Sequence, residues 1–206
     1  QYQTYDVSGL LNVGKNEILV TVGDGWWRGD TGYGGVRNSF GTDLAILCQL
    51  EIDRKTVLIS DKSWSASQEG PLGLNDLMQG ECYDARKENI CEWHPVTEKQ
   101  FGYENLVCSN SFDVVEKENY TGKQIHTPNG EVVIDFGQNI AGYVKFGFYA
   151  QAGQCITLYH GECLDQNGNF TQENFQAPEH RVEQCVKYIC KEGWNEYKPE
   201  KWFPLY

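Results

Sequence analysis

The sequence predicts an all-β protein made of two consecutive antiparallel β-sandwich domains of the jelly-roll-like type. Three observations support this fold class. Several runs of four to nine residues are rich in β-branched and aromatic side chains and end at turn formers. Glycine accounts for 22 of the 206 residues, above the usual level of about 7%. No segment keeps a helical hydrophobic period over three turns, and residues 10–14 would close one short helical turn at most.

The predicted strands follow one another without intervening helices. Residues 144–148 and 155–159 alternate between apolar and polar side chains, as half-buried strands do. The pair Asn129-Gly130 precedes a strand, and a second Asn-Gly pair at 167–168 follows one; such pairs supply the positive φ angles of tight turns. The spacing favours antiparallel sandwiches. The clearest strands are predicted at 17–22, 43–52, 56–60, 131–136, 142–149, 154–160 and 182–190.

A change in composition divides the chain. Residues 92–110 are polar, contain Pro95 and Gly102, and show no strand pattern before Leu106. We therefore expect one domain at 1–106 and a second at 107–206, the latter truncated at its C-terminal end.

The charge balance excludes two classes of partner. The chain carries 29 acidic and 17 basic residues, a net charge of -12. A nucleic-acid-binding protein needs a basic surface to displace counterions from phosphates, and the sequence offers no such stripe. No apolar run is long enough to cross a bilayer, so we expect no membrane partner. The first seven residues resemble a strand and not a leader, and we expect the chain to begin inside a larger protein.

The eight cysteines leave two interpretations open. They make up about 4% of the residues, below the 8–10% of small disulfide-rich proteins, and no CxxC pair is present. This pattern favours reduced, structural thiols over disulfides. The sequons at Asn119 and Asn169 favour secretion only weakly, because so short a motif arises often by chance.

Two adjacent tryptophans in a glycine-rich loop form the first candidate site. Residues 23–29 read GDGWWRG, but no helical pattern follows and no Lys-Ser/Thr ends the loop, so it fails as a phosphate-binding motif. A sugar fits better, because its C–H face stacks on indole and its hydroxyl groups bond to Asp24 and Arg28. In the alternative interpretation, Trp26 and Trp27 are a core residue and a sheet-edge cover, and Arg28 pairs with a nearby aspartate.

A second polar group lies at 75–86. Asn75, Asp76 and Glu81 gather hard oxygen ligands around a glycine, which could hold calcium, although the spacing is not that of an EF-hand. For Asp84 and Arg86 the sequence favours an ion pair that pins a loop. No zinc or serine-nucleophile motif is present, so nothing marks a catalytic centre.

Taken in order, five segments resemble the bacterial α-L-rhamnosidases. The amino-terminal module of those enzymes is similar to YQTYDV at 2–7, GDGWWRG at 23–29 and GECYDAR at 80–86. Their next module is similar to VIDFGQNIAG at 133–142 and HGECLDQNGN at 160–169. The segments occur in the order of the family and span nearly the whole chain.

The resemblance implies an accessory role. The parent enzyme is expected to hydrolyse terminal α-L-rhamnose with inversion, by means of carboxyl groups in a downstream (α/α)₆ barrel, and no catalytic residue is carried onto this chain. The expected partners are rhamnose-containing glycosides and that catalytic domain. An alternative is that both sandwiches are purely structural. The resemblance also implies a bacterial protein. Separately, we expect a cytoplasmic location in preference to a secreted or periplasmic one.

In some members of the family the first module binds rhamnose through calcium. Carried onto this sequence, the metal ligands are expected at Asp24 and Asn75, although no cofactor is required for the accessory role. The expected carbohydrate-binding residues are Asp24, Trp26, Trp27, Arg28, Asn75, Asp76 and Glu81.

Overall fold

The computed structural model describes residues 1–32, 35–90, 92–110, 115–176 and 182–198. It confirms the all-β prediction. Within these ranges, helical structure is confined to the single turn α1 (Gly25–Arg28) and to the 3₁₀ turns η1 (Ser8–Leu10), η2 (Ala85–Lys87) and η3 (Glu173–Phe175). The strands are β1 (Gln49–Ile52), β2 (Lys55–Ile59), β3 (Ser65–Ala66), β4 (Leu72–Asp76), β5 (Gly80–Asp84), β6 (His94–Pro95), β7 (Lys123–His126), β8 (Val132–Asp135), β9 (Phe146–Ala150), β10 (Cys155–Tyr159), β11 (Cys185–Ile189) and β12 (Gly193–Tyr197).

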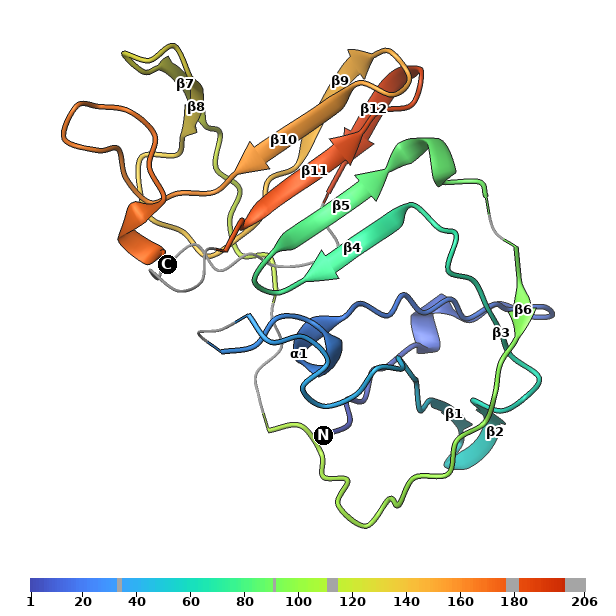
Figure 1. The fold of residues 1–206 in the computed structure, drawn as a ribbon. Helices are drawn as coiled ribbons and strands as arrows, with labels where there is room; N and C mark the ends of the chain where they lie inside the picture. The colour runs from blue at the N-terminus through green and yellow to red at the C-terminus, as the bar shows by residue number, and fades with distance from the viewer. Residues whose placement is uncertain (33–34, 91, 111–114, 177–181, 199–206) are drawn as a thin grey trace.

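A four-stranded sheet in the order β10-β11-β5-β4 lies at the centre (Figure 1). Its pairs β10–β11 and β4–β5 are antiparallel, whereas β11 and β5 run parallel with Tyr188 opposite Tyr83. The remaining strands form antiparallel two-stranded sheets, β1–β2, β3–β6, β7–β8 and β9–β12. The sheet therefore joins two strands from the first half of the chain, β4 and β5, to two from the second half, β10 and β11.

The hydrophobic core lies between this sheet and the β9–β12 pair. Tyr188 is fully buried and stacks on Tyr83, with ring centroids 5.7 Å apart. Phe146 of β9 meets the Tyr188 ring edge-on at 5.4 Å, and Tyr197 of β12 lies 4.9 Å from it. Aromatic pairs of this kind add roughly 0.5–1.5 kcal/mol beyond the area they bury. The two sheets are thus held as a sandwich by a cluster of aromatic rings.

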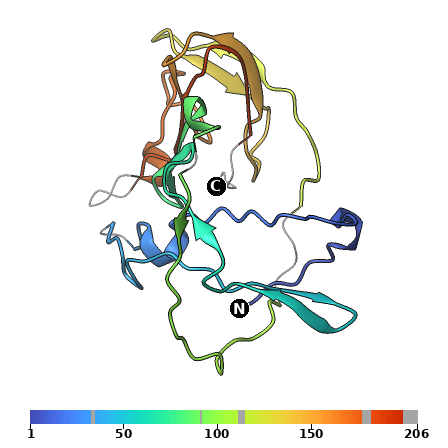
Figure 2. The ribbon, with the colours of Figure 1, turned by 90° about the vertical axis from the view of Figure 1, so that its right-hand side faces the viewer.

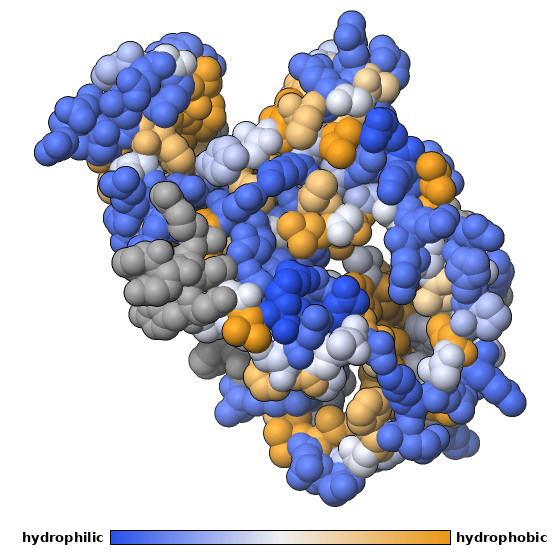
Figure 3. Space-filling view, viewed as in Figure 1, coloured by the Kyte–Doolittle hydropathy of each residue, from blue (hydrophilic) through white to orange (hydrophobic). Residues whose placement is uncertain are grey.

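The two ends of the molecule differ in packing. In the side view the sandwich occupies one end, and the amino-terminal segment with β1–β2 occupies the other (Figure 2). Apolar side chains stay exposed in that second part, including Val20, Leu47 and Val57. The space-filling view shows apolar patches between polar ones there (Figure 3). The buried apolar core of the described residues is therefore concentrated in the sandwich.

Most of the predicted strands are present, with shifted ends. The strands expected at 43–52, 56–60, 131–136, 142–149, 154–160 and 182–190 correspond to β1, β2, β8, β9, β10 and β11. Residues 17–22 have no ladder partner among the described residues. The β4–β5 hairpin falls where a loop was expected. The boundary near residue 106 stays a prediction, and β5 and β11 share one sheet across it.

Candidate functional site

The first candidate loop closes as one helical turn beside β4. In α1 the backbone N–H of Arg28 donates to the carbonyl of Asp24 at 3.1 Å, and that of Gly29 donates to the carbonyl of Gly25 at 3.2 Å. Gly25 takes a φ of 50°, which glycine adopts without steric cost. The Asp24 N–H donates to the Asn75 carbonyl at 3.0 Å. The loop is therefore bonded directly to the second candidate segment.

Close backbone approach explains two of the glycines. A Cβ atom on Gly23 would lie 2.2 Å from Oδ1 of Asn75. A Cβ atom on Gly29 would lie 2.4 Å from the Gly25 carbonyl and 2.7 Å from Oδ2 of Asp76. All three distances are shorter than any van der Waals contact, so glycine at these two positions lets the loop lie against Asn75 and Asp76.

An arginine that the sequence analysis did not single out joins the two segments. Arg37 donates from Nη2 to Oδ2 of Asp24 at 2.5 Å and from Nη1 to Oδ2 of Asp76 at 2.6 Å. Its Nη1 also lies 3.9 Å from Oδ1 of Asp30. Asp30 in turn accepts a hydrogen bond from Nε2 of Gln79 at 2.5 Å. Charge-assisted bonds of this kind are roughly twice as strong as neutral ones, so Arg37 is the centre of the site.

Asp76 is fully buried at the end of β4. Burial raises the pKa of its carboxyl group, but backbone N–H bonds from Gln79, Asp30 and Met78, together with the charge of Arg37, outweigh that effect and lower the pKa. Asp76 is therefore ionised at neutral pH. Its carboxylate bonds to groups within the protein, namely Arg37 and three backbone N–H groups.

The structure separates the roles of the two tryptophans. Nε1 of Trp27 donates to the carbonyl of Asp43 at 3.0 Å, and the ring stacks on Phe40 with centroids 6.4 Å apart. A Cβ atom on Gly41 would lie 2.5 Å from the same indole. Trp26 is the more open ring, 57% exposed. Trp27, although 45% exposed, is thus the ring that anchors the loop, and Trp26 is the more exposed of the two.

The other predicted site residues form internal pairs. Nε of Arg28 lies 3.0 Å from Oδ1 of Asp24, one of the pairings that the sequence suggested. Nδ2 of Asn75 donates to the buried carboxylate of Glu81 at 2.7 Å. For Glu81 a sugar contact stays a prediction, and its burial favours an internal role.

The predicted pairing of Asp84 with Arg86 is confirmed. Nε and Nη2 of Arg86 donate to Oδ1 and Oδ2 of Asp84 at 2.9 and 2.8 Å. The hydrogen bonds from Arg86 are the main reason why the pKa of Asp84 lies below its usual value. The pair fixes the turn that follows β5 and does not extend the candidate site.

The donor set does not suit calcium in this arrangement. Each oxygen atom of Asp24 faces a guanidinium group, Oδ1 that of Arg28 and Oδ2 that of Arg37. In the part of the chain that the structure describes, no three His, Cys, Asp or Glu side chains gather in a way that could hold a metal ion. A cation at Asp24 would have to displace an arginine, and the calcium prediction remains for experiment.

The structure also bears on the cysteines and on the possibility of a membrane-spanning helix. Seven cysteines, Cys48, Cys82, Cys108, Cys155, Cys163, Cys185 and Cys190, are free thiols; the eighth, Cys91, lies outside the described residues. Within the described ranges, no helix is both long and apolar enough to cross a membrane.

Comparison with known proteins divides the chain into two parts. Residues 1–125 match the family model of the α-L-rhamnosidase N-terminal domain, and residues 125–205 match that of the bacterial α-L-rhamnosidase concanavalin-like domain. An α-L-rhamnosidase of Streptomyces avermitilis is 31% identical over 192 residues, which cover 86% of this chain and 18% of that protein. One from Formosa agariphila is 29% identical over 219 residues, covering 96% of this chain and 22% of its own.

A solved structure shows the same architecture. The crystal structure of native α-L-rhamnosidase from Aspergillus terreus superimposes with a TM-score of 0.72 at 27% identity, over 86% of this chain and 22% of that one. The chain spans about a fifth of the length of the curated relatives it matches.

Proposed function

Since this chain belongs to the α-L-rhamnosidase family, we propose that it is the non-catalytic accessory part of an enzyme that removes terminal α-L-rhamnose from glycosides. We further propose that α1 contacts the rhamnose unit. The observation that best supports the sugar contact is the difference between the two tryptophans. The Trp27 indole is hydrogen-bonded within the loop, whereas the Trp26 ring is the more exposed of the two.

The chemistry of the loop suits a deoxyhexose. An exposed indole offers a flat apolar surface to the C–H groups of a pyranose ring. The side chains of Arg28 and Arg37 are each more than a third exposed. Both pair with the partly buried Asp24, and Arg37 also pairs with the fully buried Asp76. Such groups donate hydrogen bonds to sugar hydroxyls at low entropic cost, because they are already ordered. The arginines supply the positive charge that calcium would otherwise bring.

Calorimetric titration of L-rhamnose into the chain tests this proposal. We expect millimolar binding that falls at least tenfold in Trp26→Ala and is retained in Trp93→Ala, a control tryptophan that is 50% exposed. A chelator should leave the affinity unchanged, and a loss on chelation would favour the calcium hypothesis. Equal binding by the two variants would refute contact by Trp26.

A purely structural role is the second candidate. It is supported by the aspartates, because the carboxylates of Asp24 and Asp76 are used within the protein and the bonds run between segments distant in sequence. In that case the cluster fixes the loop on β4, and the unchanged chain gives neither heat nor a shift in melting temperature with L-rhamnose.

A further inference from the structure

A second aromatic surface lies on the outer face of the β9–β12 sheet, away from α1. Tyr149 and Trp194 are directly opposite each other in the ladder, with ring centroids 5.1 Å apart and ring planes at 64°. They are 80% and 50% exposed. Their strand neighbours Phe148 and Tyr197 pack into the core, so the alternation of the strands turns Tyr149 and Trp194 outward. We call these two rings the aromatic platform.

The platform is rigid on one side. A Cβ atom on Gly147 would lie 2.7 Å from Cζ2 of Trp194. The indole therefore rests on the bare backbone of β9, where any larger residue would displace it. A ring held in this way loses little rotational freedom when a ligand covers its other side.

Polar groups border the platform at both ends. At one end Nζ of Lys145 lies 2.8 Å from Oε1 of Glu196, and both side chains are more than half exposed. At the other end an open hollow of about 700 Å³ is lined by Tyr149, Gly193 and the polar side chains of Gln151, Gln154 and Glu192.

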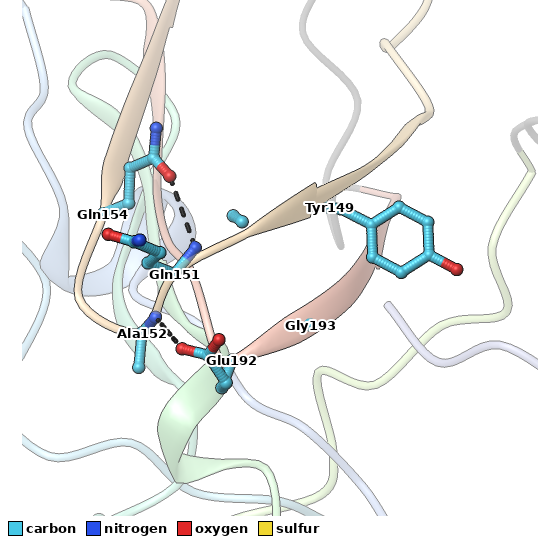
Figure 4. Close-up of a pocket in the computed structure, with 7 residues that line it drawn as sticks. Tyr149, Gln151, Ala152, Gln154, Glu192 and Gly193 are labelled. Carbon is cyan, nitrogen blue, oxygen red and sulfur yellow. Dashed lines mark hydrogen bonds between the residues drawn. The ribbon is translucent and has the colours of Figure 1, made fainter.

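The close-up shows how that hollow is built (Figure 4). The backbone N–H of Ala152 donates to Glu192 at 3.0 Å, which ties the β9–β10 turn to the β11–β12 turn. The Tyr149 ring points away from the labelled glutamines. Amide and carboxylate groups thus begin where the aromatic surface stops.

The size of the platform and the polar groups at its border favour a sugar over a protein partner. Two aromatic rings bury at most about 500 Å², whereas a stable protein interface buries about 800 Å² on each partner and has few charged residues at its centre. Here charged and amide groups begin within two residues of the rings. A pyranose has matching features, an apolar C–H face of ring size and hydroxyl groups around its edge.

We infer that the aromatic platform is a second carbohydrate-binding surface, which stacks a neutral pyranose unit of a glycan on Trp194 and Tyr149. Hydroxyl groups of the sugar bond to Lys145 and Glu196, which border the platform on one side. The aromatic platform does not include α1, so this inference can be tested separately from the proposed rhamnose contact.

Indole N–H signals of the ¹⁵N-labelled chain test this inference. Trp194 is assigned by the signal that disappears in Trp194→Ala, and the chain is titrated separately with the methyl glycosides of L-rhamnose, D-galactose and D-glucose. We expect at least one of them to shift the Trp194 signal with a dissociation constant of about 1–10 mM. Tyr149→Ala, which removes an exposed ring without opening the core, should weaken that binding at least fivefold. Trp26→Ala should leave it unchanged.

Three results would overturn the inference. One is a Trp194 signal that none of the three sugars moves. Another is a response that survives Tyr149→Ala undiminished. The third is broadening of the Trp194 signal with protein concentration and without sugar, which would assign the face to contact between copies of the chain.

Discussion

Replacing the buried carboxylate of Asp76 by an amide tests the electrostatic basis of the α1 loop. The carboxylate accepts backbone N–H bonds from Asp30 at 2.9 Å, from Met78 at 2.9 Å and from Gln79 at 3.0 Å, besides the Arg37 bond at 2.6 Å. In Asp76→Asn one acceptor becomes a donor, so on either orientation of the amide two donors lose their partner. A broken buried pair of this kind costs about 3–5 kcal/mol, and we expect the free energy of unfolding to fall by that amount.

Urea unfolding followed by circular dichroism measures the loss, and its pH dependence checks the cause. The folded pKa of Asp76 is lowered from 3.8. Its contribution to stability is therefore complete above that ordinary value and is lost as the pH falls through the lower folded value. The gap between the unchanged chain and the variant should be constant from about pH 5 to 8 and should narrow below about pH 4.

An exposed aspartate gives the matched control. Asp135 accepts one hydrogen bond, from the N–H of Gly137, and asparagine can accept the same bond. Asp135→Asn should change stability by no more than about 0.5 kcal/mol. A loss of under about 1 kcal/mol in Asp76→Asn, or a gap that persists at acid pH, would refute the argument.

Three further changes probe the same loop, each measured by thermal or urea unfolding. Arg37→Met removes the ion pairs with Asp24 and the buried Asp76, so we expect a loss of about 3 kcal/mol at pH 7 that shrinks as carboxylates become protonated at low pH; a pH-independent loss would count against pairing. Gly29→Ala drives a Cβ atom into Asp76 and should cost about 1–3 kcal/mol, whereas Gly142→Ala, which meets nothing within 4 Å, should be neutral. Trp27→Ala removes the anchoring ring and should cost about 1–3 kcal/mol; an unchanged melting temperature would show that it anchors nothing.

The local pattern located the strands that alternate and missed those that do not. Residues 144–148 and 155–159 have the period of a half-buried strand, and β9 and β10 lie there with alternating burial. β5 reads GECYD, and its inward positions hold Glu81 beside Tyr83. A buried carboxylate at a core-facing position breaks the apolar rhythm on which strand prediction rests. Its bond to Asn75 comes from the neighbouring strand, so a single segment cannot reveal it.

The site was predictable in its residue types and not in its connections. The glycines, the two tryptophans and Asp24 stand out in the sequence, and Arg28 pairs as the alternative interpretation expected. Arg37 does not stand out, because it owes its importance to Asp76, which lies 39 positions away along the chain. The one signal available was an arginine shortly after an acidic, glycine-rich loop, a pattern too common to be informative.

The parallel pairing of β5 with β11 has a consequence for how the chain reaches its folded state. Gly80 lies against Cys185 so closely that a Cβ atom would fall 2.0 Å from the Cys185 carbonyl, and the two residues are more than a hundred positions apart. The loop between them must close before either strand gains its neighbour, so we expect the sandwich to assemble slowly and late. A polypeptide that stops before residue 185 would expose the long edge of β5 and tend to aggregate, while two separately made halves should recover solubility when they are refolded together.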